Sequence, residues 1–415
     1  MQLEKYSFGL GDRFGHQGKA QLQAIILAQK QNVNITPVWN KSQREHTIIN
    51  TAPADVRTEA DEAVKTLGWS KPYYVDADHI GLKNVDLFVD SSDFFTLDVA
   101  DFIGRQVDEK DKTAFVNKCK KYVGSLQIPG IETSLQVTEE QLDTIAGKFL
   151  LAVKEAGKIY RHIEAAKGPA GFITEVSMDE TDQPQSPVEM LFILAAIADE
   201  GIPAQTIAPK FTGRFNKGVD YAGDVARFAR EFEEDLAVID FAVRQFELPE
   251  NLKLSVHSGS DKFSIYPAVN AALKKFDAGL HIKTAGTTWL EELIGLALAG
   301  GSGLSIARQI YENALSRFDE LCGPYATVID IDKSKLPAPE AVNNWSGEDF
   351  AAALRHDQAC PQYDPNFRQL LHVGYKIAAE TGQDFTGALE EYEQIIAQNV
   401  TENIYARHIK PIFID

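Results

Sequence analysis

The stretch LKLSVHSGSDKFSIYPAVNAALKKFDAGLHIKTAGT (residues 252–287) contains the pattern that decides the fold. It opens with a short apolar run that ends in polar and glycine residues, and a second run of the same kind closes it. Short apolar runs that are rich in β-branched residues and bounded in this way are typical of buried parallel strands. The chain contains eight such runs, at residues 6–12, 35–40, 73–79, 93–99, 172–177, 204–210, 252–260 and 280–287.

Most of these runs are separated by segments with apolar residues at the i, i+3, i+4 spacing of an amphipathic helix. The clearest segments are residues 19–31, 143–163, 186–201 and 221–246. Alternating strands and helices indicate an α/β protein, either a doubly wound open sheet or a TIM (β/α)8 barrel. Eight units match the barrel, and polar residues gather at the carboxyl ends of the runs, as in GLGDR, DADH and HSGSDK. The sequence therefore favours the barrel, in which those ends meet at one mouth.

The chain after about residue 290 has the pattern of helices without further strands. Helical spacing continues through residues 290–300, 305–321 and 387–409, with a proline-containing linker at 335–345. We interpret residues 1–330 as the catalytic barrel and residues 331–415 as a helical C-terminal extension packed on it.

Composition and charge narrow the class of protein. The 415 residues include 60 acidic and 41 basic side chains, a formal net charge of −19. Such a chain is repelled by nucleic acid and by anionic membranes, so we expect neither as a partner. The three scattered cysteines form no disulfide framework, the N-terminus has no signal-peptide pattern, and no apolar stretch is long enough to span a membrane. We expect a cytoplasmic enzyme, with a homo-oligomer possible.

Three histidines lie at or near the ends of predicted strands: His79, His257 and His281. Neutral imidazole is a common ligand of Zn, Mn, Co and Ni, and three protein ligands with open positions are typical of a catalytic metal site. A single histidine in such a place is more often a hydrogen-bonded structural residue. Three that converge on one barrel mouth favour a site for a divalent metal cation of unspecified identity.

Acidic residues accompany these histidines. DADH supplies Asp78 beside His79, and SMDETD supplies Asp179, Glu180 and Asp182 after the fifth run. Two carboxyl groups on opposite sides of a bound substrate suit proton removal at one face and proton return at the other. We therefore expect a carboxylate of DADH, Asp76 or Asp78, and a carboxylate of SMDETD to be catalytic, although surface loops also carry many acidic residues.

The two runs of the opening stretch also end in groups that suit a hydroxylated, anionic small molecule. Ser258 and Lys262 follow His257, and Lys283 and Thr284 follow His281. Anion sites are common after the seventh and eighth strands of barrels. The chain contains no GxGxxG motif after a strand, no P-loop motif and no GxSxG motif, so the usual sequence support for a dinucleotide, a P-loop nucleotide or a hydrolase nucleophile is missing.

Several longer motifs together resemble those of the D-tagaturonate epimerase family. They are FGLGDRFG (8–15), VDADH (75–79), VSMDETDQPQSP (176–187), LSVHSGSDKFSIYP (254–267), HIKTAGTTWLEE (281–292) and RQLLHVGY (368–375). The resemblance implies a TIM barrel that interconverts D-tagaturonate and D-fructuronate with a divalent metal. It also implies that His79, His257 and His281 bind the metal, that Asp78 is the proton acceptor and that Glu180 is the proton donor.

Such an epimerase inverts a carbon that is not adjacent to the ketone, so simple enolisation cannot do it. We expect retro-aldol cleavage, rotation of the aldehyde and re-addition, with Arg13, Lys262 or Lys283 holding the substrate carboxylate. One alternative is a metal-dependent aldolase or ketose isomerase acting on a related sugar. A second alternative is a non-catalytic barrel that binds sugar acids.

Overall fold

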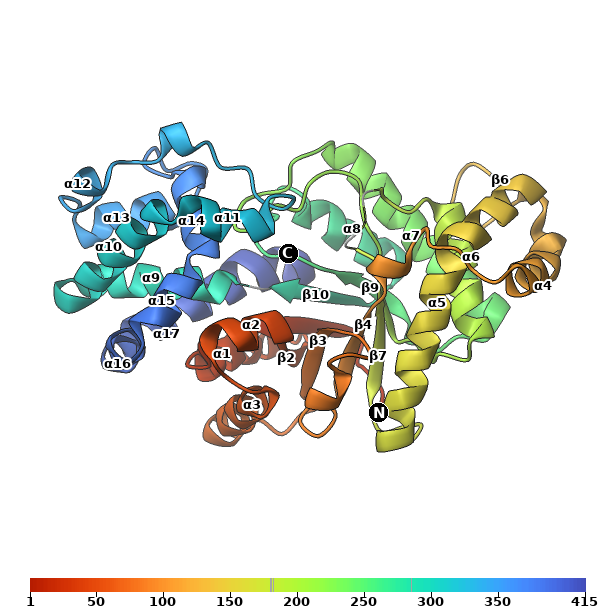
Figure 1. Cartoon of the computed structure of the whole chain (residues 1–415), viewed down its shortest axis with the longest axis horizontal. Coiled ribbons are helices and arrows are strands. Elements are labelled where there is room, and N and C mark those ends of the chain that lie inside the picture. Colours follow the sequence, from red (N-terminus) through yellow and green to blue (C-terminus); the bar gives the residue numbers. More distant parts are fainter. Residues whose placement is uncertain (180, 182, 285) are drawn as a thin grey trace.

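The computed structural model describes residues 1–179, 181, 183–284 and 286–415. Within these residues, eight parallel strands pair in chain order and close into a barrel, the last strand lying beside the first (Figure 1). The predicted (β/α)8 barrel is confirmed, and each predicted run overlaps one barrel strand. These strands are β1 (Tyr6–Gly11), β2 (Thr36–Ser42), β3 (Tyr74–Ile80), β4 (Phe94–Asp98), β7 (Ile173–Ser177), β8 (Thr206–Ala208), β9 (Lys253–Val256) and β10 (Leu280–Thr284).

The barrel interior is apolar at the amino-terminal ends of the strands, its lower end, and polar nearer the mouth at their carboxyl ends. A buried cluster closes the lower end and consists of Leu3, Val38, Tyr74, Phe94 and Ile173. Side chains two residues apart on a strand share one face, so the next inward positions on β3, β4 and β7 are Asp76, Thr96 and Glu175. All three are buried. The apolar layer therefore supports a polar layer directly beneath the mouth.

Helices cover the outside of the barrel. They are α1 (Gly18–Lys30), α2 (Gln43–Ile49), α3 (Pro53–Leu67), α4 (Glu109–Cys119), α5 (Glu139–Lys167), α6 (Pro187–Asp199), α7 (Val225–Phe246) and α8 (Tyr266–Phe276). The four clearest predicted helices correspond to α1, α5, α6 and α7. Between β3 and β4 the chain forms only the 3-10 turn η1 (Val85–Leu87), and between β4 and α5 it adds a hairpin of β5 (Gly124–Leu126) and β6 (Leu135–Val137). In the part of the chain that the structure describes, no helix is long and apolar enough to cross a membrane.

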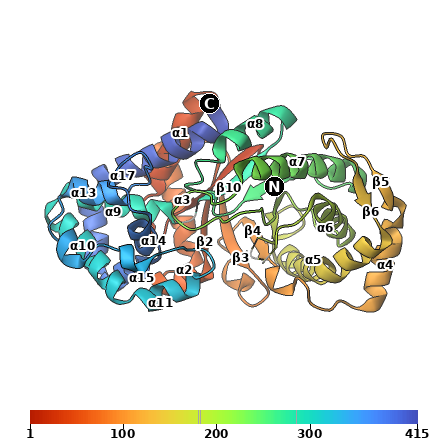
Figure 2. The ribbon, with the colours of Figure 1, turned by 90° about the horizontal axis from the view of Figure 1, so that it is seen from above.

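A helical region follows β10 and lies to one side of the barrel (Figure 2). It contains α9 (Thr287–Ala299), α10 (Gly301–Ser316), α11 (Phe318–Cys322), α12 (Pro339–Val342), α13 (Gly347–Leu354), α14 (Pro365–Val373), α15 (Tyr375–Thr381), α16 (Gln383–Glu391) and α17 (Glu393–Glu402). Short 3-10 turns at Gly323–Tyr325 and Lys333–Lys335 lie between α11 and α12, and two more, at Ala100–Phe102 and Lys120–Tyr122, lie between β4 and β5. Because α10 packs against α12 and α14, the helices on both sides of residue 330 pack together. The division at residue 330 stays a prediction.

The end of the chain returns to the barrel. The π-helical segment η6 (Asn403–Ile414) continues from α17 and packs against both α1 and α8. In a regular barrel, the helix that follows β10 would lie between α8 and α1. Here the helix that follows β10 is α9, which packs instead against α10, α13 and α17. The C-terminal segment thus closes the ring of helices around the barrel.

A buried ion pair joins the helical region to the loop that follows β9. Arg368 on α14 donates from Nη2 to Oδ2 of Asp261 at 2.6 Å, and both side chains are fully buried. The guanidinium also donates to the backbone carbonyls of Gly218 and Leu354. The backbone N–H of Asp261, a residue with φ of 61°, donates to Nε2 of His408 on η6. Two separate parts of the C-terminal region therefore fix the loop that begins at the barrel mouth.

We predict that Arg368→Met lowers the free energy of unfolding by about 3–5 kcal/mol, because it leaves the Asp261 carboxylate buried without its cation. Urea denaturation followed by circular dichroism measures the change. Arg244→Ala is the control, since this residue forms an exposed ion pair on α7 and should have almost no effect. A stability of Arg368→Met equal to that of the control would contradict this role for the pair.

Candidate active site

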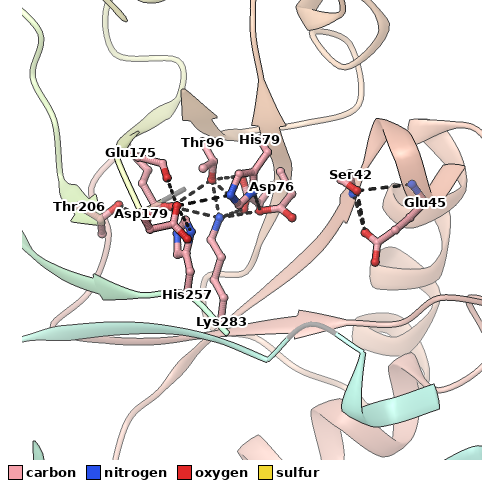
Figure 3. Close-up of polar contacts among 12 residues, drawn as sticks. Ser42, Glu45, Asp76, His79, Thr96, Glu175, Asp179, Thr206, His257 and Lys283 are labelled. Atoms are coloured by element: carbon pink, nitrogen blue, oxygen red, sulfur yellow. Dashed lines mark hydrogen bonds and ion pairs between the residues drawn. The ribbon is translucent and has the colours of Figure 1, made fainter. Parts of the chain in front are cut away.

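The polar layer of the barrel is organised around the ammonium group of Lys283. Its Nζ donates to Asp76 Oδ2 at 2.7 Å and to Asp78 Oδ1 at 2.8 Å, and it lies 3.0 Å from Glu175 Oε1. Thr96 also contacts this nitrogen. These carboxylates raise the pKa of Lys283 well above its usual value, against the opposing effect of burial. Lys283 is therefore a charged group whose donors already contact the protein's own carboxylates (Figure 3).

An irregularity at the end of β3 turns two consecutive side chains toward the mouth. In a regular strand Asp78 and His79 would point to opposite faces. Here the pairing of β3 with β4 shifts register between Ala77 and Ile80, and His79 has a positive φ of 54°. A non-glycine residue in this conformation carries backbone strain and is uncommon. The result is that Asp78 and His79 both line the cavity above the polar layer.

His79 and His257 converge on Asp179, which follows β7. Asp179 Oδ1 lies 3.2 Å from His257 Nδ1 and 3.7 Å from His79 Nε2, and the two imidazole rings are 5.0 Å apart. One ligand atom from each residue lies within 4.8 Å of the others. His257 Nδ1 is buried, and its contact with Asp179 lacks the geometry of a hydrogen bond. Two nitrogens and one oxygen thus face a common point, as ligands of a divalent cation would.

Each of these imidazoles is oriented by a carboxylate on its other nitrogen. His79 Nδ1 lies 3.0 Å from Asp78 Oδ1, and His257 Nε2 lies 2.7 Å from Glu175 Oε1 (Figure 3). Metal-ligating histidines usually donate their second N–H to a carboxylate, carbonyl or water, which fixes the tautomer and the ring orientation. The structure provides this arrangement twice, and both supporting carboxylates also contact Lys283.

The charge around this group is negative. Burial raises the pKa of Asp76 to about 7, although Lys283 opposes the shift. With the imidazoles neutral, as metal ligation requires, the carboxylates Asp78, Glu175 and Asp179 outnumber the one ammonium group, Lys283. Burial alone would lower the pKa of His257, yet the neighbouring carboxylates raise it to about 9. The site therefore attracts positive charge, whether a proton or a metal cation.

The structure places His281 one layer deeper than Lys283. Both residues are on the inward face of β10, but His281 pairs in register with Ser7 and lies against the ring of Phe94. Its Nδ1 is 2.8 Å from Ser7 Oγ, and its Nε2 has no partner among the residues that the structure describes. Burial lowers the pKa of His281 to about 3, so it is a neutral imidazole. The structure does not bring it into the group formed by His79, Asp179 and His257.

The predicted substrate-binding residues have different surroundings. Arg13 and Ser258 line the cavity, Arg13 paired with Glu45 and stacked 3.9 Å from the ring of Tyr375. Thr284 donates to the carbonyl of Gly9 at 2.7 Å and so joins β10 to β1.

Lys262 lies outside the cavity lining and donates to the carbonyls of Asn216, Val219 and Ser260. Burial lowers the pKa of Lys262 to about 8. Of the predicted substrate residues, the structure therefore brings Arg13 and Ser258 to the cavity, together with the already paired Lys283.

The cavity above the polar layer has a volume of about 300 Å³ and continues into a second hollow of about 340 Å³. Volumes of this size are typical of sites for small molecules. Five residues line both hollows: Arg44, Asp179, Lys217, His257 and Ser258. The wall shared by the two hollows thus includes members of the candidate metal group and two cationic side chains.

Two residues of the candidate site are not assigned from the sequence, and one assigned residue lies outside the described part of the chain. Asp179 was noted only as one of several carboxylates after β7. Glu175 lies within the apolar run of β7 and is fully buried. Ionisable residues are rarely buried without a partner, so a glutamate inside an apolar strand is itself a sequence signal of an internal polar contact. Glu180, the predicted proton donor, is not among the described residues.

Comparison with known proteins gives one family over nearly the whole length. A tagaturonate/fructuronate epimerase from Thermotoga maritima is 29% identical over 419 residues, covering 97% of this chain and 80% of the relative. A glycerol-bound crystal structure of fructuronate-tagaturonate epimerase from Cohnella laeviribosi superposes with a TM-score of 0.82 at 23% identity, covering 99% of this chain and 82% of the other. The native form of the same enzyme gives a TM-score of 0.79. The model of the tagaturonate epimerase family matches residues 1–412, and the chain therefore belongs to this family of isomerases.

Proposed function

We propose that the protein interconverts D-tagaturonate and D-fructuronate in a metal-dependent reaction. The observation that carries the proposal is the convergence of His79, Asp179 and His257 at the barrel mouth, each histidine being supported by a carboxylate. The Thermotoga relative bears the name of this activity. A small sugar acid also fits the size of the cavity and its mixture of acidic and cationic residues.

The donor set fits a divalent transition metal. Imidazole and carboxylate ligands suit Zn, Mn, Co and Ni, and the surrounding carboxylates favour a cation at this point. His79, His257 and Asp179 would hold the metal, and His281, assigned from the sequence, remains a further predicted ligand whose buried Nε2 lacks a partner among the described residues. When bound, the cation would supply Lewis-acid stabilisation of negative charge on substrate oxygens.

The protein's own residues would move the protons. Burial raises the pKa of Asp78, but the charges of Lys283 and His79 outweigh it and hold the pKa below the usual range, so Asp78 is a carboxylate. In the proposed reaction it accepts the proton of the hydroxyl on the inverting carbon. The bond from that carbon toward the ketone breaks, leaving an aldehyde, and the bond's electron pair enters an enediolate.

Re-addition completes the inversion. The aldehyde rotates by half a turn and the enediolate attacks its opposite face, which re-forms the carbon–carbon bond with the other configuration. Glu180 donates a proton to the new alkoxide, so the hydroxyl is restored and no atom is lost. The roles of Asp78 and Glu180 exchange in the reverse direction, as two-sided acid–base catalysis requires.

Incubation of the enzyme with D-tagaturonate in D₂O, followed by NMR, tests this reaction. We expect D-fructuronate to form without deuterium at the inverted carbon, because no C–H bond breaks there. A sample treated with chelator should form no product, and metal addition should restore the activity. Deuterium at the inverted carbon would exclude the retro-aldol route, and accumulation of two three-carbon fragments would indicate an aldolase.

We predict that His257→Ala and Asp179→Asn lose most of the bound metal, because each removes one of few ligands. Metal content per chain, measured by mass spectrometry after dialysis, gives the result. His162→Ala is the matched control, since this exposed histidine on α5 also pairs with an acidic residue, Asp86. Wild-type metal content in His257→Ala would remove this residue from the site. The same assay on His281→Ala decides whether the sequence-based assignment of that residue is right.

Glu180→Gln should lower turnover by about 10²-fold or more while metal remains bound, because the amide cannot donate or accept the transferred proton. Steady-state kinetics and metal analysis on the same preparation separate the two effects. The exposed Glu132→Gln is the control and should behave as the wild type. Near-normal turnover of Glu180→Gln would show that Glu180 is only a surface carboxylate.

A further inference from the structure

Lys217 is a lysine on the cavity wall that the reaction above does not use. It lies in the loop between β8 and α7 and lines both hollows, together with His257 and Asp179. Lys217 Nζ forms no hydrogen bond or ion pair with any residue that the structure describes. An ammonium group that is half-buried at a cavity wall without an anionic partner is a site for an anion.

The backbone around Lys217 is held in place by buried cations. Lys262 donates to the carbonyls of Asn216 and Val219, and Arg368 donates to the carbonyl of Gly218. The N–H of Lys217 itself donates to the carbonyl of Val328 at 2.8 Å. Contacts on both sides of the residue therefore fix its backbone position relative to the mouth.

Two arginines add positive charge beside Lys217. Arg13 pairs with Glu45, and the exposed Arg44 on α2 lies 5.1 Å from the ring of Tyr325. Burial, followed by the charge of Arg13, lowers the pKa of Lys217. Glu45, the partner of Arg13, lies apart from the cluster around Lys283 (Figure 3). The cavity is thus lined by groups of both charge signs: acidic residues around the metal group, and cationic side chains from α2 and from the loop between β8 and α7.

Two other lysines near the site are already occupied. Lys283 contacts carboxylates inside the barrel, and Lys262 contacts three backbone carbonyls. Neither ammonium is available to an incoming anion without breaking those bonds. Lys210 lines only the second hollow. Of the described lysines that line the cavity above the polar layer, Lys217 is therefore the one with its donors unused.

We propose that Lys217, together with Arg44, binds the carboxylate of the sugar-acid substrate and selects uronates over neutral ketohexoses. This inference rests on the proposed function. The carboxylate of a ketohexuronate is at the end of the chain remote from the ketone, so a substrate whose ketone lies at the metal group can extend its carboxylate to the cationic side chains of the cavity wall.

The same contact has a second consequence for the reaction. Cleavage leaves a three-carbon aldehyde that carries the carboxylate and has no covalent link to the other fragment. An ion pair to Lys217 retains this fragment while its aldehyde group rotates. The carboxylate subsite therefore favours re-addition over release, which is the difference between an epimerase and an aldolase.

Calorimetric titration of the metal-loaded protein with D-galactonate and with its neutral counterpart galactitol tests the subsite. The wild type should bind galactonate more tightly. Lys217→Gln should weaken galactonate binding by about 10- to 100-fold and leave galactitol binding unchanged. Lys217→Arg, which keeps the charge, should retain most of the affinity, and the exposed Lys335→Gln should match the wild type. Arg44→Gln, on the protein surface, provides the same test if Lys217→Gln does not fold.

The proposal is overturned if Lys217→Gln binds galactonate as tightly as the wild type does, and Arg44→Gln gives the same test when it replaces that variant. It is also overturned if the wild type binds galactonate and galactitol with equal affinity. During turnover of tagaturonate, Lys217→Gln should also release more three-carbon aldehyde, detected with a hydrazine trap. A wild type that binds galactonate through Lys217 but does not convert tagaturonate would refute the proposed reaction and leave the carboxylate subsite intact.

Discussion

The site depends on one buried ammonium group. Asp76 and Asp78 project into the barrel from β3 and Glu175 from β7, and three ionisable carboxyl groups buried this close together repel each other strongly. Lys283 lies among them and offsets this repulsion. It also fixes Asp78 and Glu175, which in turn orient His79 and His257. The geometry of the candidate metal group thus depends on a lysine that does not belong to it. The positive φ of His79 is supported by the contact of its ring with Asp78, which Lys283 fixes.

The barrel and much of the site could be predicted from the sequence because both depend on local patterns. The short apolar runs indicated all eight strands, and polar residues at their ends indicated His79, His257 and Asp78. The surroundings of Lys283 could not be read in this way, since a lysine at a strand end looks the same whether it faces a substrate or internal carboxylates. The β3 bulge, which brings consecutive residues to one cavity, also depends on pairing with β4 and has no signal in DADH itself.

Contacts between distant segments account for the remaining differences. Lys262 was predicted to contact substrate, but its partners are the carbonyls of Asn216 and Val219 in another loop. Arg44 and Lys217 are separated by most of the barrel sequence and have no motif in common, so only the folded chain brings them to one wall. The return of η6 to the barrel likewise depends on the space that α9 leaves beside β10 and β1.

A cavity lined by both charge signs suits the proposed inversion at a carbon remote from the ketone. In that proposal, one group of residues stabilises charge and exchanges protons, and another holds the fragment that is free for part of the cycle. The two groups differ in origin: the acidic residues and histidines come from the ends of β3 and β9 and from the loop after β7, whereas Lys217 and Arg44 come from a loop and a helix outside the strands. The loop carrying Lys217 is tied to α14 through Arg368 and to the β9 loop through Lys262. The helical region therefore contributes to the site by fixing the backbone that carries Lys217.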